Sequence, residues 1–538
     1  MRVLSDLLPL LYLAALAVGS VLLADGSWKS VTSYRSEYVL DRTFEAGPAL
    51  ASRVVVVVFD GLSVDSAADL PVFGDLSDRG APGTLRTTVP SLSNPARAAI
   101  LTGAWAEVSG VTNNSSFEPV PVQSLFSLAR QQGMESMAYG TRFWPRAFGE
   151  DLGDGYRRPS RRPVSYEIGE VTAWQDEACQ EVSAHLQDSS ANLAVVALLA
   201  GDDAGHSYGG ESAEYREAVA AVDRCVGQLA DVLGQGATFV VVSDHGHIHH
   251  WGKGGHGGDE PEVMNAPFVM AGPGVKRSGP IDARIVDIAP TVSVLLGLPI
   301  PANSQGAVLW DALEVPPEHQ GRLRDLERVQ REAIDAHLPD REESLAAERR
   351  SRLLLAIGSC VWLVLVALAA LRRQRLVPLG TSVAVFVASF LVLAYFFQLG
   401  TSISAVVREE YLYSFFVRLI GAAALGFGAA AFCLTRFDHA SGGATASQTP
   451  QVGARRPWLA SPQADATVRL GLLITSGFAL FVTATYYQHG LLMHNWMIEI
   501  GPVFAAYLGL LAILGVALGT IVAVALTALR RGKAAKST

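Results

Sequence analysis

The sequence has few cysteines, few charged residues and no concentrated block of basic residues. Its 538 residues include four cysteines, too few for a disulfide framework to hold the fold together. With a formal net charge of −9 and no basic block, nothing indicates nucleic acid as a partner. Charged residues make up 17% of the chain and the mean hydropathy is +0.27. This composition is too apolar for an ordinary soluble enzyme.

The apolar residues are concentrated at the two ends of the chain. Residues 1–26 hold one apolar run, which we interpret as a transmembrane anchor because Ala24-Asp25-Gly26 is a poor cleavage site for a signal peptide. Five later runs each have about the 20 residues that a bilayer requires. They cover 353–371, 377–398, 412–434, 468–487 and 503–528, within a predicted transmembrane domain of residues 353–529.

Basic residues lie in alternate loops between these runs. They are Arg372, Arg373 and Arg375, then Arg455 and Arg456, then Arg530, Arg531 and Lys533. By the positive-inside rule these loops, and the tail of residues 530–538, are cytoplasmic. Arg349, Arg350 and Arg352 oppose this orientation, but they count for less after a long exported domain. We therefore expect an integral membrane protein, of a bacterial inner membrane or its equivalent, with a periplasmic or extracytoplasmic domain.

Residues 27–315 form the predicted exported domain. Buried-type strands are expected at 54–59, 193–199, 239–242 and 267–271, and helices at 165–188, 211–234 and 286–296. This alternation predicts an α/β fold with a mostly parallel sheet sandwiched by helices. Residues 316–352 are charged and lack an obvious apolar face, so we expect a juxtamembrane helical segment, either a stalk or a helix lying on the membrane. Few charges lie within the apolar runs, which disfavours a transporter.

The two pairs of cysteines have different surroundings. Cys360 and Cys433 fall inside apolar runs and are expected to be packing residues. Cys179 and Cys225 lie on two helix-like stretches of the exported domain and could form a disulfide there. Sequence spacing does not show whether their Cα atoms approach each other, so pairing stays open.

Acidic and imidazole side chains follow three of the predicted strands. Asp60 follows the first, Asp202 and His206 follow the second, and Asp244 and His245 follow the third. Open α/β sheets bind ligands at the carboxyl edge of their strands. Carboxylate oxygen and imidazole nitrogen are both good zinc ligands. The sequence therefore predicts a metal site at this edge.

A further imidazole is expected from the glycine-rich stretch that follows Asp244. His256 has the context Gly-His-Gly-Gly, which favours it as a ligand. The interval before it also contains His247, His249 and His250, and any of these could take its place.

The stretch from Thr88 to Gly103 reads as a loop that leads into an apolar helix. Ser93 lies at the expected start of that helix, where backbone N–H groups favour an anion. A serine beside metal ions would be deprotonated and could attack phosphorus, so Ser93 is the candidate nucleophile, with Ser91 as a competitor. Asn94 and Arg97 are candidates for substrate binding. Arg97 could instead be a helix-surface residue.

These motifs, in this order, resemble the alkaline phosphatase superfamily. The similarity is to its type I phosphodiesterase/nucleotide pyrophosphatase branch and to the GPI ethanolamine-phosphate transferases, over residues 51–315. It rests on Asp60-Gly61, Ser93-x-Pro95, Thr102-Gly103, Asp202-x-x-x-His206, Asp244-His245-Gly246, His256-Gly257 and the stretch 286–306.

The resemblance implies a set of roles for these residues. Asp202, His206 and His256 would hold one Zn²⁺. Asp60, Asp244, His245 and Ser93 would hold a second; Mn²⁺ or another divalent metal could replace zinc. We expect a membrane-bound, outward-facing phosphodiesterase or phosphoethanolamine-type phosphotransferase. It would act on a phospholipid or glycolipid through a serine phospho-enzyme.

Two other functions stay open. The run Ser93-x-Pro-x-Arg97 is similar to the motif in which sulfatases modify a serine or cysteine to formylglycine. Sulfatases usually show paired acids after the first strand and bind one calcium, whereas this chain offers Asp60 alone. A scaffold with a degenerate catalytic domain is the third possibility, and the complete set of ligand residues disfavours it.

Overall fold

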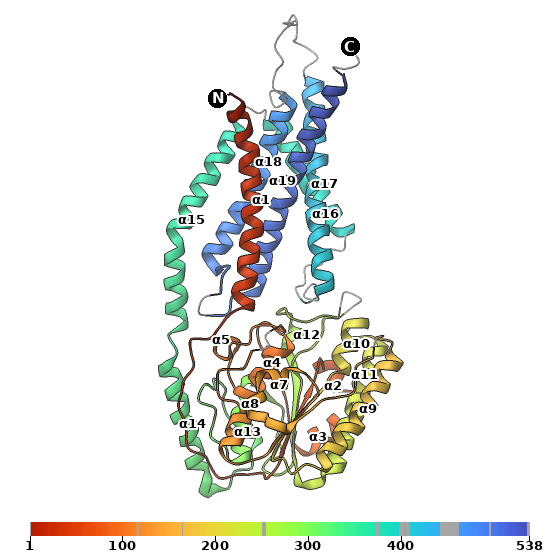
Figure 1. Ribbon diagram of the computed structural model, residues 1–538, viewed down its shortest axis with the longest axis vertical. Helices are drawn as coiled ribbons and strands as arrows, with labels where there is room; N and C mark the ends of the chain where they lie inside the picture. Colours follow the sequence, from red (N-terminus) through yellow and green to blue (C-terminus); the bar gives the residue numbers. More distant parts are fainter. Residues whose placement is uncertain are drawn as a thin grey trace, which may run out of the picture.

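The computed structural model describes residues 2–115, 118–163, 165–249, 254–372, 376–396, 404, 409–441, 462–493 and 496–534. A globular α/β domain lies at one end of a bundle of long helices (Figure 1). The first turns of α1 (Arg2–Thr32) and the last turns of α19 (Ile500–Ala534) lie at the far end of the bundle from this domain.

An eight-stranded sheet forms the centre of the globular domain, in the order β4-β3-β5-β1-β6-β7-β2-β8. Its strands are β1 (Val54–Phe59), β2 (Ala81–Arg86), β3 (Ser136–Tyr139), β4 (Tyr156–Arg157), β5 (Leu193–Leu198), β6 (Thr238–Val242), β7 (Asn265–Ala271) and β8 (Ile281–Arg284). Strand β7 runs antiparallel to both β6 and β2, and the other pairs are parallel. The predicted mostly parallel sheet is confirmed.

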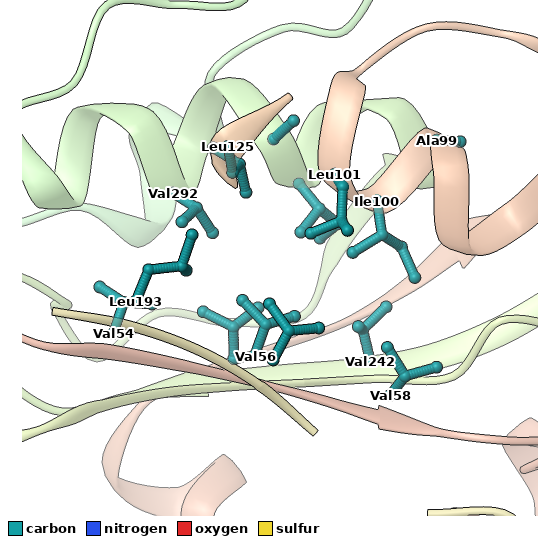
Figure 2. Packing of buried hydrophobic residues seen from close by; sticks show 14 of the residues in the cluster. Val54, Val56, Val58, Ala99, Ile100, Leu101, Leu125, Leu193, Val242 and Val292 are labelled. Atoms are coloured by element: carbon teal, nitrogen blue, oxygen red, sulfur yellow. The ribbon is translucent and has the colours of Figure 1, made fainter. Parts of the chain in front are cut away.

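The central strands are buried on both faces, which explains their unbroken apolar sequences. Alternate residues of β1 face opposite sides of the sheet. Val54, Val56 and Val58 pack in one cluster with Ile100 and other residues of α4 (Figure 2). Val55, Val57 and Phe59 face the other side of the sheet and belong to a second cluster. Parallel sheets require such cover on both faces.

Helices cover each face of the sheet. The first cluster includes residues of α4 (Ser93–Thr102), α6 (Leu125–Gln131), α7 (Phe143–Ala147) and α13 (Ile288–Leu296). The second includes residues of α3 (Pro71–Arg79), α9 (Ile168–Gln187) and α11 (Ala213–Leu233). The remaining helices of the domain are α2 (Val64–Ala67), α5 (Ala106–Ser109), α8 (Gly149–Leu152), α10 (Ala200–Tyr208) and α12 (Pro261–Met264). The three predicted helices correspond to α9, α11 and α13.

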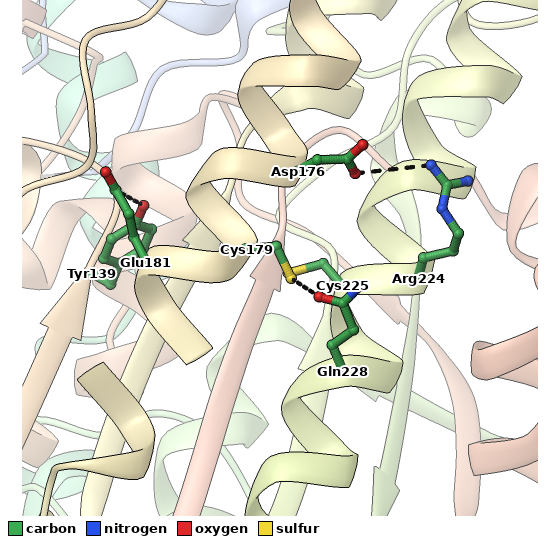
Figure 3. Close-up of a disulfide and its surroundings, with 7 residues drawn as sticks. All are labelled: Tyr139, Asp176, Cys179, Glu181, Arg224, Cys225 and Gln228. Atoms are coloured by element: carbon green, nitrogen blue, oxygen red, sulfur yellow. Dashed lines mark hydrogen bonds and ion pairs between the residues drawn. A yellow bond between two sulfur atoms is a disulfide. The ribbon is translucent and has the colours of Figure 1, made fainter. Parts of the chain in front are cut away.

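A disulfide joins Cys179 of α9 to Cys225 of α11, with the two Cα atoms 5.5 Å apart (Figure 3). The pairing that sequence spacing left open is therefore present. It links two helices that pack side by side on the same face of the sheet.

The prediction that residues 316–352 lack an apolar face is wrong. Helix α14 (Pro317–His337) buries Leu323 and Ile334, and Leu323 joins the core of the globular domain. The side-chain amide of Gln330, also buried, donates hydrogen bonds to the backbone carbonyls of residues 301, 302 and 304. Positions 323, 330 and 334 share one side of a helix, so three residues suffice to dock α14. Helix α14 is therefore packed on the globular domain, whereas residues 341–352 belong to α15.

Six long helices form the bundle: α1 (Arg2–Thr32), α15 (Arg341–Leu371), α16 (Leu376–Phe396), α17 (Glu409–Ser441), α18 (Pro462–His489) and α19 (Ile500–Ala534). Among the described residues, five stretches are long and apolar enough to cross a membrane, one of them near the N-terminus. In α16 the apolar stretch, Leu379–Leu393, is shorter. These helices indicate an integral membrane protein. Arg373, Arg375, Arg455 and Arg456, on which the predicted orientation partly rests, lie outside the described residues.

Candidate metal centre

The predicted ligands converge because β5, β1 and β6 are neighbours in the sheet. Asp60 directly follows β1, and Asp244 and His245 follow β6. Asp202 and His206 lie one turn apart on α10, which begins just after β5. Together with α4 and α12, α10 lies on the side of the globular domain nearest the helical bundle (Figure 1).

The first predicted ligand set forms a compact triangle. Oδ1 of Asp202 lies 3.3 Å from Nε2 of His206 and 3.4 Å from Nε2 of His256. The two imidazole nitrogens are 3.0 Å apart. A tetrahedral zinc ion with bonds of about 2.0–2.2 Å holds its ligand atoms about 3.3 Å from one another. The three residues therefore fit one face of a zinc site.

The second predicted set brings together Asp60, Asp244 and His245, whose ligand atoms lie within 4.8 Å of one another. Nε2 of His245 is 3.5 Å from Oδ1 of Asp60 and 3.8 Å from Oδ2 of Asp244. These two carboxylate oxygens are buried, and the described residues offer them no hydrogen-bond partner. Buried oxygens of this kind need a compensating cation, so this set also fits a metal ion.

Ser93 is the first residue of α4, and its hydroxyl reaches the second set. Its Oγ lies 3.1 Å from Nε2 of His245, and the side chain is buried. Ser91, the competing serine, is occupied elsewhere. Its hydroxyl donates to the carbonyl of Gly258 and accepts from the N–H of Gly257. The geometry favours Ser93 over Ser91.

Ser91 also orients His256. Nδ1 of His256 lies 2.8 Å from the backbone carbonyl of Ser91, so this nitrogen carries the proton and donates. The other nitrogen, Nε2, is then left with its lone pair toward Asp202 and His206. Such hydrogen bonds commonly fix the tautomer of metal-binding histidines.

Arg97 is buried, and its interpretation as a helix-surface residue is wrong. Its guanidinium pairs with Asp60 and lies 3.7 Å from Oδ2 of Asp244. It also contacts the amide oxygen of Asn94 at 3.4 Å. Arg97 therefore neutralises part of the acidic set, and its predicted role in substrate binding stays a prediction.

Asn94 is held by a residue that sequence reasoning did not single out. Its backbone N–H donates to the side-chain oxygen of Asn114, and its own amide donates to the backbone carbonyl of Asn114, both at 2.9 Å. Asn114 thus fixes the residue next to Ser93. A single asparagine in a loop carries no pattern that would have identified it.

The carboxylates have opposite electrostatic environments. Burial raises the pKa of Asp202, but the imidazoles of His206, His247 and His256 outweigh burial and hold the pKa well below its ordinary value. Burial and the neighbouring charge of Asp60 raise the pKa of Asp244 well above its ordinary value. Burial lowers the pKa of His245, which favours its neutral, ligating form. Asp202 is thus prepared to bind a cation, whereas Asp244 needs one to stay ionised.

His247 is present beside His256 and does not replace it. Its imidazole is fully buried, with Nε2 3.2 Å from Oδ1 of Asp202. His249 belongs to none of the described metal-type groups, and His250 lies outside the described residues. Asp244 and Gly257 enclose five histidines, and the path of the loop decides which of them reach the carboxylates.

The helical bundle touches the loop that carries His256. Ser404, from the segment between α16 and α17, donates to Oε2 of Glu260 at 2.6 Å. It also accepts the N–H of Gly258 at 2.9 Å. A residue between α16 and α17 therefore contacts the loop that carries His256.

Comparison with known proteins places these motifs in a family context. Residues 54–254 match the family described as type I phosphodiesterase / nucleotide pyrophosphatase. GPI ethanolamine phosphate transferase 3 of Schizosaccharomyces pombe is 27% identical over 172 residues, which cover 31% of this chain and 18% of that protein. GPI ethanolamine phosphate transferase 1 of Mus musculus is 25% identical over 306 residues, 48% of this chain and 32% of that protein. The chain thus spans a third or less of the length of these two relatives.

Among solved structures, this chain has a partial likeness to murine ectonucleotide pyrophosphatase / phosphodiesterase 5. It is 15% identical with a TM-score of 0.40, covering 49% of this chain and 100% of that one. Wild-type alkaline phosphatase PafA is 12% identical with a TM-score of 0.40, covering 50% and 100%. The chain resembles the type I phosphodiesterase / nucleotide pyrophosphatase branch of the alkaline phosphatase superfamily over residues 54–254, as the order of its motifs indicated.

Proposed function

We propose that this protein is a membrane-bound, zinc-dependent phosphodiesterase or phosphoethanolamine-type phosphotransferase, with Ser93 as its nucleophile. The observation that carries the proposal is the position of the Ser93 hydroxyl. It lies at the start of α4, 3.1 Å from Nε2 of His245, beside two sets of carboxylate and imidazole groups. The resemblance of residues 54–254 to phosphodiesterases supports the reaction class.

The roles of the residues follow from their chemistry. Two divalent cations held by these groups would lower the pKa of the serine hydroxyl and neutralise phosphate charge. Ser93 Oγ forms a bond to phosphorus as the bond to the leaving alcohol breaks. Water or an acceptor alcohol then displaces Ser93 in a second step. Backbone N–H groups at the start of α4 favour the anionic phosphate, and Arg97 offsets the charge of Asp60.

A phospholipid or glycolipid is the proposed substrate class. The candidate centre lies on the side of the domain nearest the bundle, and Ser404 contacts the His256 loop (Figure 1). A headgroup at the membrane surface would need to travel only a short distance to Ser93. The GPI ethanolamine phosphate transferases, which the chain matches in part, support a headgroup phosphodiester.

We further propose that the globular domain is periplasmic or extracytoplasmic and the C-terminal tail cytoplasmic. The disulfide between Cys179 and Cys225 supports this, because disulfides persist in oxidising compartments. The end of α19 lies at the far side of the bundle from the domain, in agreement with the predicted alternation of basic loops (Figure 1).

The proposal is tested by incubating the detergent-solubilised protein with labelled phospholipids. Wild type should release or transfer a headgroup, and Ser93→Ala should reduce turnover by roughly 1,000-fold or more. Ser91→Ala should retain measurable turnover, because that hydroxyl only binds the neighbouring loop. Equal turnover by wild type and Ser93→Ala would exclude Ser93 as the nucleophile.

A sulfatase is the second candidate, and the pairing of Arg97 with Asp60 favours it, since it places the arginine of the Ser-x-Pro-x-Arg motif at the centre. The imidazole-rich ligand sets argue against it, because calcium prefers oxygen ligands. Mass spectrometry of the peptide containing Ser93 distinguishes the two. An unmodified serine supports the phosphodiesterase, and a formylglycine, lighter by two hydrogens, supports the sulfatase.

A further inference from the structure

The imidazole of His247 lies inside the candidate centre, facing Asp202. The side chain is fully buried. Nδ1 has no hydrogen-bond partner within the described part of the chain, and Nε2 faces Oδ1 of Asp202 without a well-aligned hydrogen bond. A buried polar group left in this state is costly, and buried imidazoles are nearly always hydrogen-bonded or bound to a metal.

His247 approaches Asp202 in the same way as the two predicted ligands do. Its Nε2 lies 3.2 Å from Oδ1 of Asp202, compared with 3.3 Å for His206 and 3.4 Å for His256. That oxygen is itself buried and lacks a hydrogen-bond partner among the described residues. Three imidazoles therefore surround one carboxylate oxygen at 3.2–3.4 Å. A cation is the partner that would serve all of these groups.

Glycines enclose the ring of His247. A Cβ atom added at Gly205 would lie 2.5 Å from Nε2, and one at Gly61 would lie 2.8 Å from the same atom. At Gly254 it would lie 3.0 Å from Nδ1, and at Gly210 it would lie 3.0 Å from the Cβ of His247. The four glycines come from separate parts of the loops around the centre. Each leaves space that any larger side chain would take from the imidazole.

His247 lies between the two predicted ligand sets. Its ligand nitrogen groups with those of Asp202 and His245, all within 4.8 Å of one another. Asp202 is thus shared with the His206–His256 set, and His245 is shared with the Asp60–Asp244 set. Arg97 pairs with Asp60 and approaches Asp244, but no described ion pair joins it to Asp202, so the imidazole-rich set stays free of its charge.

We infer that His247 is a metal ligand of this protein, adding a nitrogen to the cation that Asp202 holds, beside the cation that His245 holds. The inference rests on the proposed metal-dependent function and deepens it. A set of three imidazoles and one carboxylate favours Zn²⁺ or Co²⁺ over Ca²⁺ and Mg²⁺. It would give the centre one more imidazole than the two predicted sets supply.

The test uses the full-length protein in detergent, stripped of metal with a chelator and titrated with Zn²⁺ and Co²⁺. Wild type is compared with His247→Met, which fills similar space without a nitrogen, and with His249→Met as the matched control from the same loop. X-ray absorption of the zinc-loaded proteins counts the imidazoles bound to metal. His247→Met should lower metal affinity by roughly tenfold or more and reduce the imidazole count, and His249→Met should change neither.

Two results would overturn the inference. In the first, His247→Met has the affinity and the imidazole count of wild type. In the second, affinity falls but the imidazole count stays the same, which would make His247 a positioning residue for Asp202. His247→Gln, which keeps a polar side chain, is measured in parallel in case His247→Met does not fold. If wild type itself binds no stoichiometric metal, the proposed function fails; if only the His247 comparison fails, the proposed function stands.

Discussion

The Nε2 atoms of His206 and His256 lie 3.0 Å apart, although 50 positions separate the two residues in the chain. Helix α10 holds the first, and the hydrogen bond from Nδ1 to the carbonyl of Ser91 holds the second. Together with Oδ1 of Asp202, the two nitrogens form a triangle. Its sides match the distance between neighbouring ligand atoms around a tetrahedral zinc ion. This pair is the most specific geometric support for a metal centre.

Replacing His256 by Ala should therefore remove metal from the protein. Loss of one of three protein ligands should weaken binding by roughly 100-fold or more. Elemental analysis after dialysis against buffer of defined free zinc measures the effect. His337→Ala, at an exposed position on α14, is the matched control and should retain the wild-type metal content. Equal retention by His256→Ala would contradict the assignment of this ligand.

Arg97→Ala should destabilise the metal-free protein more than the metal-loaded protein. Without Arg97, the buried carboxylate of Asp60 loses its charged partner, and breaking a buried pair costs about 3–5 kcal/mol. A bound cation would supply part of the missing positive charge. Thermal unfolding with chelator and with zinc measures the two differences. An identical decrease in the melting temperature with chelator and with zinc would show that the guanidinium and the cation do not share the same carboxylates.

Removing the disulfide should destabilise the globular domain without altering the metal centre. The Cys179–Cys225 bond closes a loop with a sequence separation of 46 residues. Loss of such a loop closure costs about 2–4 kcal/mol. Denaturant unfolding of the double Cys→Ser variant measures the cost, and its metal content should equal that of wild type. Unchanged stability would mean that the two helices are held by packing alone.

Stability under acid conditions should depend on Glu181. Burial raises the pKa of this carboxyl, but hydrogen bonds from Ser160 and Tyr139 outweigh burial and lower the pKa below its ordinary value of 4.5 (Figure 3). A lowered pKa stabilises the folded state above pH 4.5, and this contribution is lost as the pH falls through the folded pKa. Tyr139→Phe removes one of the hydrogen bonds. The variant should therefore show a smaller difference in the free energy of unfolding between pH 7 and pH 3.5, measured with chelator present. An unchanged difference would contradict the role of Glu181 in acid stability.

The strands and helices that could be predicted from the sequence are those whose local residue pattern is compatible with only one type of secondary structure. The valine run of β1 predicts a strand buried on both faces, and the structure places it at the centre of the sheet. The amphipathic patterns of α9 and α11 likewise predict helices. Asp60, Asp202 and Asp244 could be placed at one edge because each directly follows such a strand. The local pattern of β7 gives no direction, so its antiparallel pairing could not be foreseen.

What the sequence could not show depends on contacts between distant segments. Leu323 and Ile334 look isolated within a charged stretch, and their burial follows only from docking against the domain core. Arg97 is one of many arginines until Asp60 is placed beside it. The space for the buried side chain of His247 depends on four glycines that come together only in the folded loops.

Anomalous X-ray scattering at the zinc edge, from crystals of the full-length protein grown with zinc, tests the central claim most directly. The account predicts one peak among Asp202, His206 and His256 and a second beside Ser93 and His245. Absence of anomalous density at both positions would contradict a metal-dependent function for this protein.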